Sequence, residues 1–173
     1  MMQKPRNNEP DSTIWLEEHG LTHARMLAFG ALMRAHAATL SRIEARLAGL
    51  DVLSLEWYGV LLTLEAAPVG RLRMGELGSH VALSRSGLTR LVDRLEAAEL
   101  VTRRLNPEDR RSFEVSVTPQ GRAERARSWP THARLIAEEF GARFSDEEAT
   151  QLSALLRRQF QNLPSPQNCN KSR

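Results

Sequence analysis

Two neighbouring segments carry the strongest structural signals in this chain: residues 83–96, LSRSGLTRLVDRLE, and residues 101–118, VTRRLNPEDRRSFEVSVT. In the first segment, Ser84 can cap a helix, because its hydroxyl accepts an unpaired backbone N–H of the first turn. Apolar side chains then recur at helical spacing, at Leu88, Leu91, Val92 and Leu95. The pattern predicts an amphipathic helix with one buried face.

The opposite face of this predicted helix is polar and basic. It carries Arg85, Ser86, Thr89, Arg90, Asp93 and Arg94. Serine and threonine hydroxyls can bond base edges or phosphates, and arginine pairs bidentately with guanine, so this face suits the major groove of DNA. An amphipathic surface helix with solvated charges is the alternative, and this segment alone does not decide between the two.

The second segment predicts a basic β-hairpin. Residues 101–105 and 113–117 are short β-prone runs, and the NPEDRR sequence between them is polar and turn-forming. The hairpin carries four arginines, Arg103, Arg104, Arg110 and Arg111. Asp109 is close enough to Arg111 in the sequence to orient its guanidinium. Such a hairpin is a poor core element, and together with the preceding helix it favours DNA binding over incidental surface charge.

These segments resemble the MarR family of winged helix-turn-helix regulators. The matching pieces are LSLEWYGVLLTL, LSRSGLTRLVDRLE, LVTRR, NPEDRR and VTPQGR, which run from about Leu53 to Arg122. The resemblance implies a mainly α fold with a small β-hairpin wing, in which a winged helix-turn-helix lobe is joined to N- and C-terminal dimerisation helices. Glu99 stands where the family usually has glycine, a residue that tolerates the left-handed end of a helix. We therefore expect the helix to end differently there or to carry strain.

The flanking sequence extends this organisation. Residues 1–10 and 164–173 are polar and are predicted to be disordered tails. Residues 11–52 and 118–163 are predicted to be N- and C-terminal dimerisation helices on either side of the DNA-binding lobe at 53–117.

Local signals predict where the individual helices begin and end. Candidate caps precede four of them, at Ser54, Ser84, Thr118 and Ser145. A long helix is predicted over 21–48, ending at Gly49. Residues 74–81 are predicted to be the first helix of the helix-turn-helix, after a loop marked by Pro68 and Gly70. Pro130 is expected to kink or break the helix that starts after Thr118.

Composition narrows the class of protein. The 173 residues carry a formal charge of +3, with a basic centre between Arg71 and Arg111 and an acidic stretch between Glu138 and Glu148. A basic centre indicates a polyanionic partner. The single cysteine, Cys169, excludes an intramolecular disulfide and a cysteine-rich zinc site. We expect a cytoplasmic, non-membrane protein, because neither a long apolar run nor a signal-peptide pattern is present.

Catalysis and metal binding are not expected. The sequence contains no GxSxG, P-loop, HExxH or GxGxxG motif, and its five histidines are scattered. His19 and His23 are four residues apart, but Gly20 lies between them and no acidic or cysteine ligand is placed nearby. We expect no cofactor.

Two residues are candidates for an effector pocket. His36 falls on the apolar stripe of the long helix, where a core histidine bonded to a neighbour is the favoured interpretation and a pocket residue is the alternative. Trp57 is expected to be a core residue, and the resemblance places its helix beside the pocket where small effectors bind in many relatives.

The resulting hypothesis is a homodimeric, sequence-specific transcriptional regulator, acting as a repressor on a palindromic operator under the control of a small molecule. The alternative is an architectural or interaction module that uses the winged helix for non-specific contacts. The polar face of the recognition helix favours specific reading. The predicted DNA-binding residues are Arg73, Ser84, Arg85, Ser86, Thr89, Arg90, Arg94, Asp109, Arg110 and Arg111.

Overall fold

The computed structural model describes residues 20–67, 69–81, 83–106 and 113–159. The chain divides into two compact units, at 1–41 and 42–173. The described part of the first unit contains most of helix α2 (His23–Leu47). The large apolar side chains of this part of α2 are exposed, and the relative exposure of Phe29 is 63%. Among the described residues, no helix has both the length and the apolar run needed to cross a bilayer.

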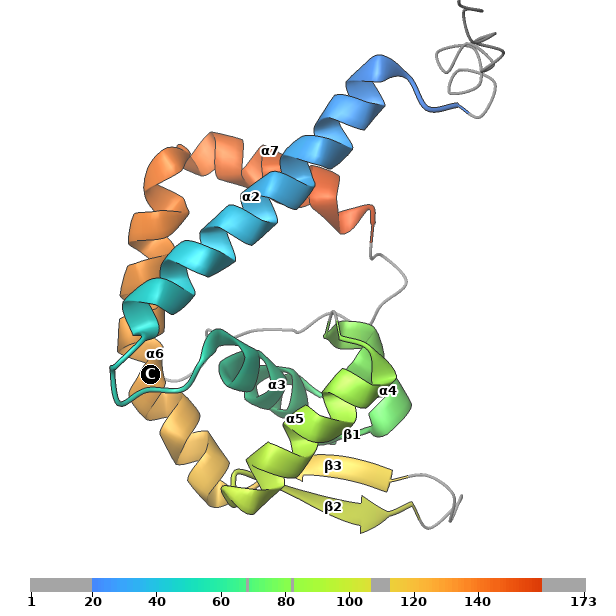
Figure 1. Cartoon of the computed structure of the whole chain (residues 1–173), viewed down its shortest axis with the longest axis vertical. Helices are drawn as coiled ribbons and strands as arrows, with labels where there is room; N and C mark the ends of the chain where they lie inside the picture. The colour runs from blue at the N-terminus through green and yellow to red at the C-terminus, as the bar shows by residue number, and fades with distance from the viewer. Residues whose placement is uncertain (1–19, 68, 82, 107–112, 160–173) are drawn as a thin grey trace, which may run out of the picture. The chain divides into compact units, whose positions relative to one another are not determined.

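The second unit holds a helical lobe with a small sheet, followed by two further helices (Figure 1). The helices are α3 (Leu55–Ala66), α4 (Met74–His80), α5 (Arg85–Ala97), α6 (Pro119–Glu139) and α7 (Asp146–Arg157), with a short 3-10 turn at Gly141–Arg143 before α7. All four predicted caps are confirmed, because each side chain accepts a backbone N–H of its first turn. The strands are β1 (Arg71–Arg73), β2 (Val101–Leu105) and β3 (Phe113–Val117).

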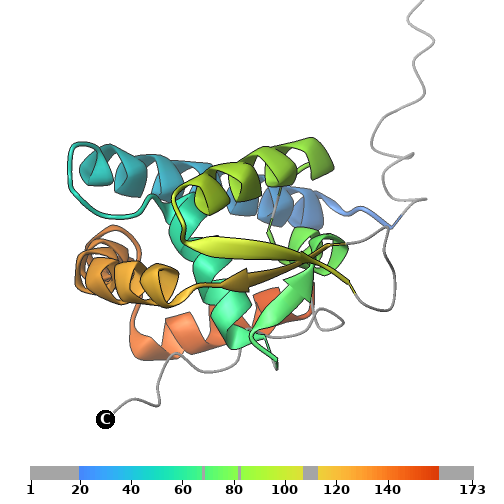
Figure 2. The same ribbon diagram turned by 90° about the horizontal axis from the view of Figure 1, so that it is seen from below.

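The described strands form one antiparallel sheet in the order β1-β3-β2 (Figure 2). The predicted hairpin is confirmed, with Val101 paired to Val117 and Leu105 paired to Phe113. The prediction that the segment before α4 is only a loop is wrong, because Leu72 of β1 pairs with Val115 of β3. Three residues are too short to show an alternating pattern, so the pairing with β3 decides their conformation.

The core lies between α3, α4, α5 and the sheet. The predicted apolar face of α5 is buried there, and Leu91 packs in the same cluster as Leu61 and Leu64 of α3 and Leu77 of α4. Fully burying a leucine side chain stabilises the fold by about 1.5–3 kcal/mol, so this cluster holds the recognition helix firmly on α3.

A second cluster joins the end of α2 to α6. It contains Ile43, Leu47 and Leu135. Only this end of the predicted α2 stripe is buried, since Leu32 and Leu40 remain exposed. The favoured prediction of a core histidine at His36 is wrong for this chain, because His36 is exposed.

Pro130 does not break its helix, since α6 continues through it as one element. Proline removes the N–H that would bond the carbonyl four residues earlier, here Ala126. Both residues lie on the exposed side of α6, where water can satisfy that carbonyl.

Glu99 adopts the left-handed conformation, with a φ of 59°. The end of α5 is a Schellman motif: the Leu100 N–H donates to the Leu95 carbonyl and the Glu99 N–H to the Glu96 carbonyl, each at 2.9 Å. The helix therefore ends as it would with glycine, and the second expectation, strain, is confirmed.

Replacing Glu99 with glycine should raise the stability of the fold by about 1 kcal/mol, because glycine has no Cβ to strain this conformation. The thermal midpoint should rise by about 2–4 °C. Glu99→Ala is the matched control, since alanine keeps the Cβ and should leave the midpoint unchanged. Equal midpoints for the glycine and alanine variants would contradict the assignment of strain to this residue.

Candidate nucleic-acid interface

The first two turns of α5 present polar side chains on their exposed side. Ser84 accepts the Gly87 N–H at 3.1 Å and lies 3.3 Å from the Ser86 hydroxyl. The Thr89 hydroxyl donates to the Arg85 carbonyl at 3.0 Å. These bonds orient the hydroxyls while leaving lone pairs that can accept from a ligand.

Two arginines of this helix are available for an external partner. Arg85 and Arg90 are exposed, and neither makes an ion pair or a side-chain hydrogen bond within the part of the chain that the structure describes. An open hollow of about 730 Å³ is lined by five of the predicted DNA-binding residues, Ser84, Arg85, Ser86, Thr89 and Arg90. The structure thus brings these five together on one surface.

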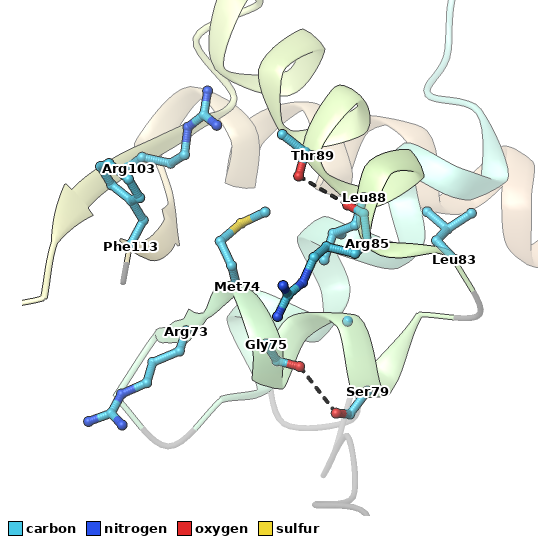
Figure 3. Close-up of a pocket in the computed structure, with 11 residues that line it drawn as sticks. Arg73, Met74, Gly75, Ser79, Leu83, Arg85, Leu88, Thr89, Arg103 and Phe113 are labelled. Carbon is cyan, nitrogen blue, oxygen red and sulfur yellow. Dashed lines mark hydrogen bonds between the residues drawn. The ribbon is translucent and has the colours of Figure 1, made fainter. Parts of the chain in front are cut away.

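A groove of about 660 Å³ continues from α5 toward α4 and the strands of the hairpin. Its basic lining comes from Arg73, Arg85 and Arg103. Figure 3 shows the Arg73 side chain pointing away from the other lining residues, at the start of α4. The Glu76 carboxylate accepts the Arg73 backbone N–H at 2.8 Å, so Arg73 opens the helix without a side-chain cap of its own.

Arg103 differs from the expectation that it adds free positive charge to the hairpin. Its guanidinium lies 2.6 Å from Asp93 and 2.8 Å from Glu96, both on α5. Glu96 also accepts the Arg103 backbone N–H at 3.0 Å. The side-chain hydrogen bond with Arg103 lowers the pKa of Glu96 and raises that of Arg103. Arg103 therefore ties β2 to the recognition helix, a role that sequence reasoning missed although Asp93 and Glu96 lie one turn apart.

Replacing Arg103 with glutamine should destabilise the fold by about 1–2 kcal/mol at neutral pH, because the side chain is 24% exposed and bonds two carboxylates. The pKa of Glu96 is lowered in the folded state. The stabilisation from its pair with Arg103 is therefore complete above the ordinary glutamate pKa of 4.5, and it is lost as the pH falls through the lowered pKa of the folded state. Urea unfolding at pH 7 and near pH 3 measures the difference. The neighbouring exposed Arg104→Gln is the control, and a gap between the variants that persists undiminished at pH 3 would contradict the assignment.

Arg94 is less available than Arg90. It pairs with Glu56 of α3 at 3.4 Å, and both side chains are exposed. Such a pair contributes at most about 1 kcal/mol, so it does not prevent a phosphate contact. Asp109, Arg110 and Arg111 lie outside the described residues.

The two candidates for an effector pocket are placed differently. His36 is an exposed residue of the first unit, whereas Trp57 is half-buried on α3 and packs against the core. Within the described ranges, no group of three His, Cys, Asp or Glu side chains is placed to hold a metal ion. His19 lies outside those ranges.

Sequence reasoning also missed a polar stripe on α6. Ser128 and His132 are fully buried, and Arg125 is largely buried. Their spacing of three and four residues places them on one helical face, which is the signal that could have revealed them.

Known proteins that are similar to this chain are transcriptional regulators. The sequence model of the MarR family matches residues 49–112. A protein of Thauera aromatica, described as a transcriptional regulatory protein for the hcr operon, is 31% identical over 139 residues, which cover 80% of this chain and 78% of that protein. The HTH-type transcriptional regulator YkoM of Bacillus subtilis (strain 168) is 30% identical over 89 residues, and the match spans 51% of this chain but only 57% of YkoM.

A solved structure is similar over most of its length. It is Sco3205, a MarR family transcriptional regulator from Streptomyces coelicolor, in complex with DNA. The TM-score is 0.70 at 26% identity, and the match covers 84% of this chain and 94% of Sco3205.

Proposed function

The chain belongs to the MarR family of DNA-binding transcriptional regulators, and from that premise we propose that it acts as a homodimeric repressor on a palindromic operator and is released by a small molecule. The observation that supports DNA reading is the exposed face of the first two turns of α5. There Ser86, Thr89 and Arg90 share one open hollow, and Arg90 has no competing partner in the described chain.

We assign different roles to the predicted DNA-binding residues. Ser86, Thr89 and Arg90 contact base edges in the major groove. Phosphates are contacted by Arg73, Ser84, Arg85 and Arg94, which fix the position of the helix on the duplex. In the wing, Arg110 contacts the backbone, and Arg111 enters the minor groove with Asp109 orienting its guanidinium.

The dimer accounts for apolar surface that the single chain leaves exposed. None of the described residues of α7 is buried, and Leu155 is 53% exposed. Phe29 on α2 is exposed as well. We assign both helices, within the segments 11–52 and 118–163, to a two-fold interface, which is the commonest way to cover such faces. Two recognition helices would then lie about one DNA turn apart, roughly 34 Å.

We propose that a small effector binds beside α3, with Trp57 as one wall of its site. Trp57 supports this because its indole is half-buried against the core and still partly accessible. A ligand there would touch the helix on which α5 packs.

Sequencing the genomic DNA fragments that the purified protein retains tests the proposed function. The leading fragment and a scrambled copy are then compared for affinity at one salt concentration. An affinity ratio on the order of a thousand or more supports a sequence-specific regulator. A ratio near one would instead mean an architectural module that contacts only the backbone.

Arg90→Ala should weaken operator binding by about 1–3 kcal/mol, roughly tenfold to a hundredfold, and relax the choice of base at one position per half-site. A binding-site selection with the variant measures both effects. Arg85→Ala is the comparison, because loss of a phosphate contact should weaken all sequences alike. A uniform loss with Arg90→Ala would move that residue to the backbone.

A further inference from the structure

The polar stripe on α6 reaches both ends of α3. Near the start of α3, the Ser128 hydroxyl accepts the Leu53 N–H at 3.1 Å, and His132 Nε2 lies 2.8 Å from the Leu53 carbonyl. A carbonyl only accepts hydrogen bonds, so Nε2 carries the proton. Two side chains one turn apart on α6 therefore hold both backbone polar groups of one residue.

Arg125 holds the other end of α3. Its guanidinium lies 2.8 Å from the Glu65 carboxylate in the last turn of α3, and it donates to the Tyr58 hydroxyl at 3.2 Å. The Tyr58 ring in turn stacks on His132, with ring centroids 4.4 Å apart. The Arg125 and Glu65 side chains are only 20% and 16% exposed.

These contacts restrict motion in a way that the apolar contacts do not. Burial of apolar faces is non-directional, and Leu135 of α6 lies in only a small cluster with Ile43, Leu47 and Leu55, so apolar contacts alone set the angle between α3 and α6 loosely. A hydrogen bond weakens steeply when its angle changes, and a largely buried ion pair that loses its partner is costly. Contacts at both ends of α3 therefore set its angle to α6.

In the proposed function, the angle between α3 and α6 couples DNA binding to dimerisation. The apolar cluster fixes α5 on α3, so α5 turns with α3. Figure 1 shows α6 leading from the sheet toward α7, whose exposed stripe we assigned to the dimer interface.

We propose that Arg125, Ser128 and His132 are positioning residues for DNA recognition, because they set the angle between α3 and α6 and thereby the distance between the two recognition helices of the dimer. The proposal rests on the proposed function of a homodimer on a palindromic site. Under this proposal, the half-site spacing that the dimer prefers depends on α6 side chains that do not contact DNA.

The test measures affinity for the retained genomic site, for versions with one or two base pairs added to or removed from its centre, and for a single half-site. Wild type should lose about tenfold or more when the spacing changes. Arg125→Gln should bind the native site about tenfold more weakly, bind the half-site within about twofold of wild type, and lose most of the spacing preference. Arg134→Gln is the control, since Arg134 is an exposed α6 residue that pairs only with Glu138, at 3.5 Å, among the described residues.

Light scattering and circular dichroism check that the variant is a folded dimer. If Arg125→Gln does not fold, Ser128→Ala decides, because it removes one hydrogen bond and should reduce the spacing preference in the same direction. A folded variant with the wild-type spacing profile, or with equal losses for the half-site and the full site, overturns the proposal. If wild type itself shows no spacing preference, the palindromic homodimer fails, whatever the variants do.

Discussion

Replacing Gly121 with alanine should destabilise this protein by about 3 kcal/mol or more. Gly121 is buried in the first turn of α6, directly against the Leu100 backbone. A Cβ there would lie well inside van der Waals contact of the Leu100 backbone oxygen and 2.9 Å from Val117 Cγ2. That oxygen also accepts the Thr118 N–H at 3.0 Å, so it cannot move without breaking the junction between β3 and α6. The thermal midpoint should fall by about 6–12 °C.

Gly59→Ala is the matched control for this substitution. Gly59 lies within α3, and a Cβ there would meet nothing within 4 Å. Alanine should raise stability by about 0.5–1 kcal/mol at that position, because it favours helix over the unfolded chain. Opposite shifts of the two midpoints are expected in a thermal melt. A Gly121→Ala midpoint within about 2 °C of wild type would mean that the junction is looser than the structure has it.

Replacing Leu155 with glutamate should convert the protein largely to monomer and abolish tight operator binding. Burial of a leucine contributes about 1.5–3 kcal/mol, and two-fold symmetry places the residue twice in the interface. The dimer dissociation constant should therefore rise by about a hundredfold or more, since 1.4 kcal/mol corresponds to tenfold. Light scattering across a dilution series measures the dissociation, and a gel-shift assay measures the affinity for DNA.

Ala154→Glu adds the same charge to the same helix but on the face away from the apolar stripe, and Ala154 is exposed. It should leave the dimer and DNA binding unchanged. A Leu155→Glu protein that stays dimeric at the concentrations where wild type does would place the interface elsewhere and remove α7 from it.

The local structure of this chain follows from its sequence. The caps at Ser54, Ser84, Thr118 and Ser145 and the hairpin register are predictable because each depends on residues that are close in the sequence. The polar face of α5 is predictable for the same reason, since helical spacing alone places Ser86, Thr89 and Arg90 together.

The tertiary structure decides which partners the charged and polar residues take. Arg103 has the same sequence signal as Arg104, yet it faces Asp93 and Glu96 while Arg104 is exposed. Residues 71–73 form strand β1 because they pair with β3.

Distant contacts also explain residues that the sequence pattern leaves unremarkable. His132 is buried because it meets Leu53, 79 residues earlier in the chain. Gly121 is required because the Leu100 carbonyl approaches it across the junction. Short-range hydrogen bonds and periodic burial therefore make the capped helices, the two hairpin strands and the exposed face of α5 predictable from the amino-acid pattern alone. The pairing of Arg103 depends on how β2 packs against α5, and the α3–α6 stripe and the close approach at Gly121 depend on groups that folding brings together from distant parts of the chain. These three features are therefore visible only in the folded structure.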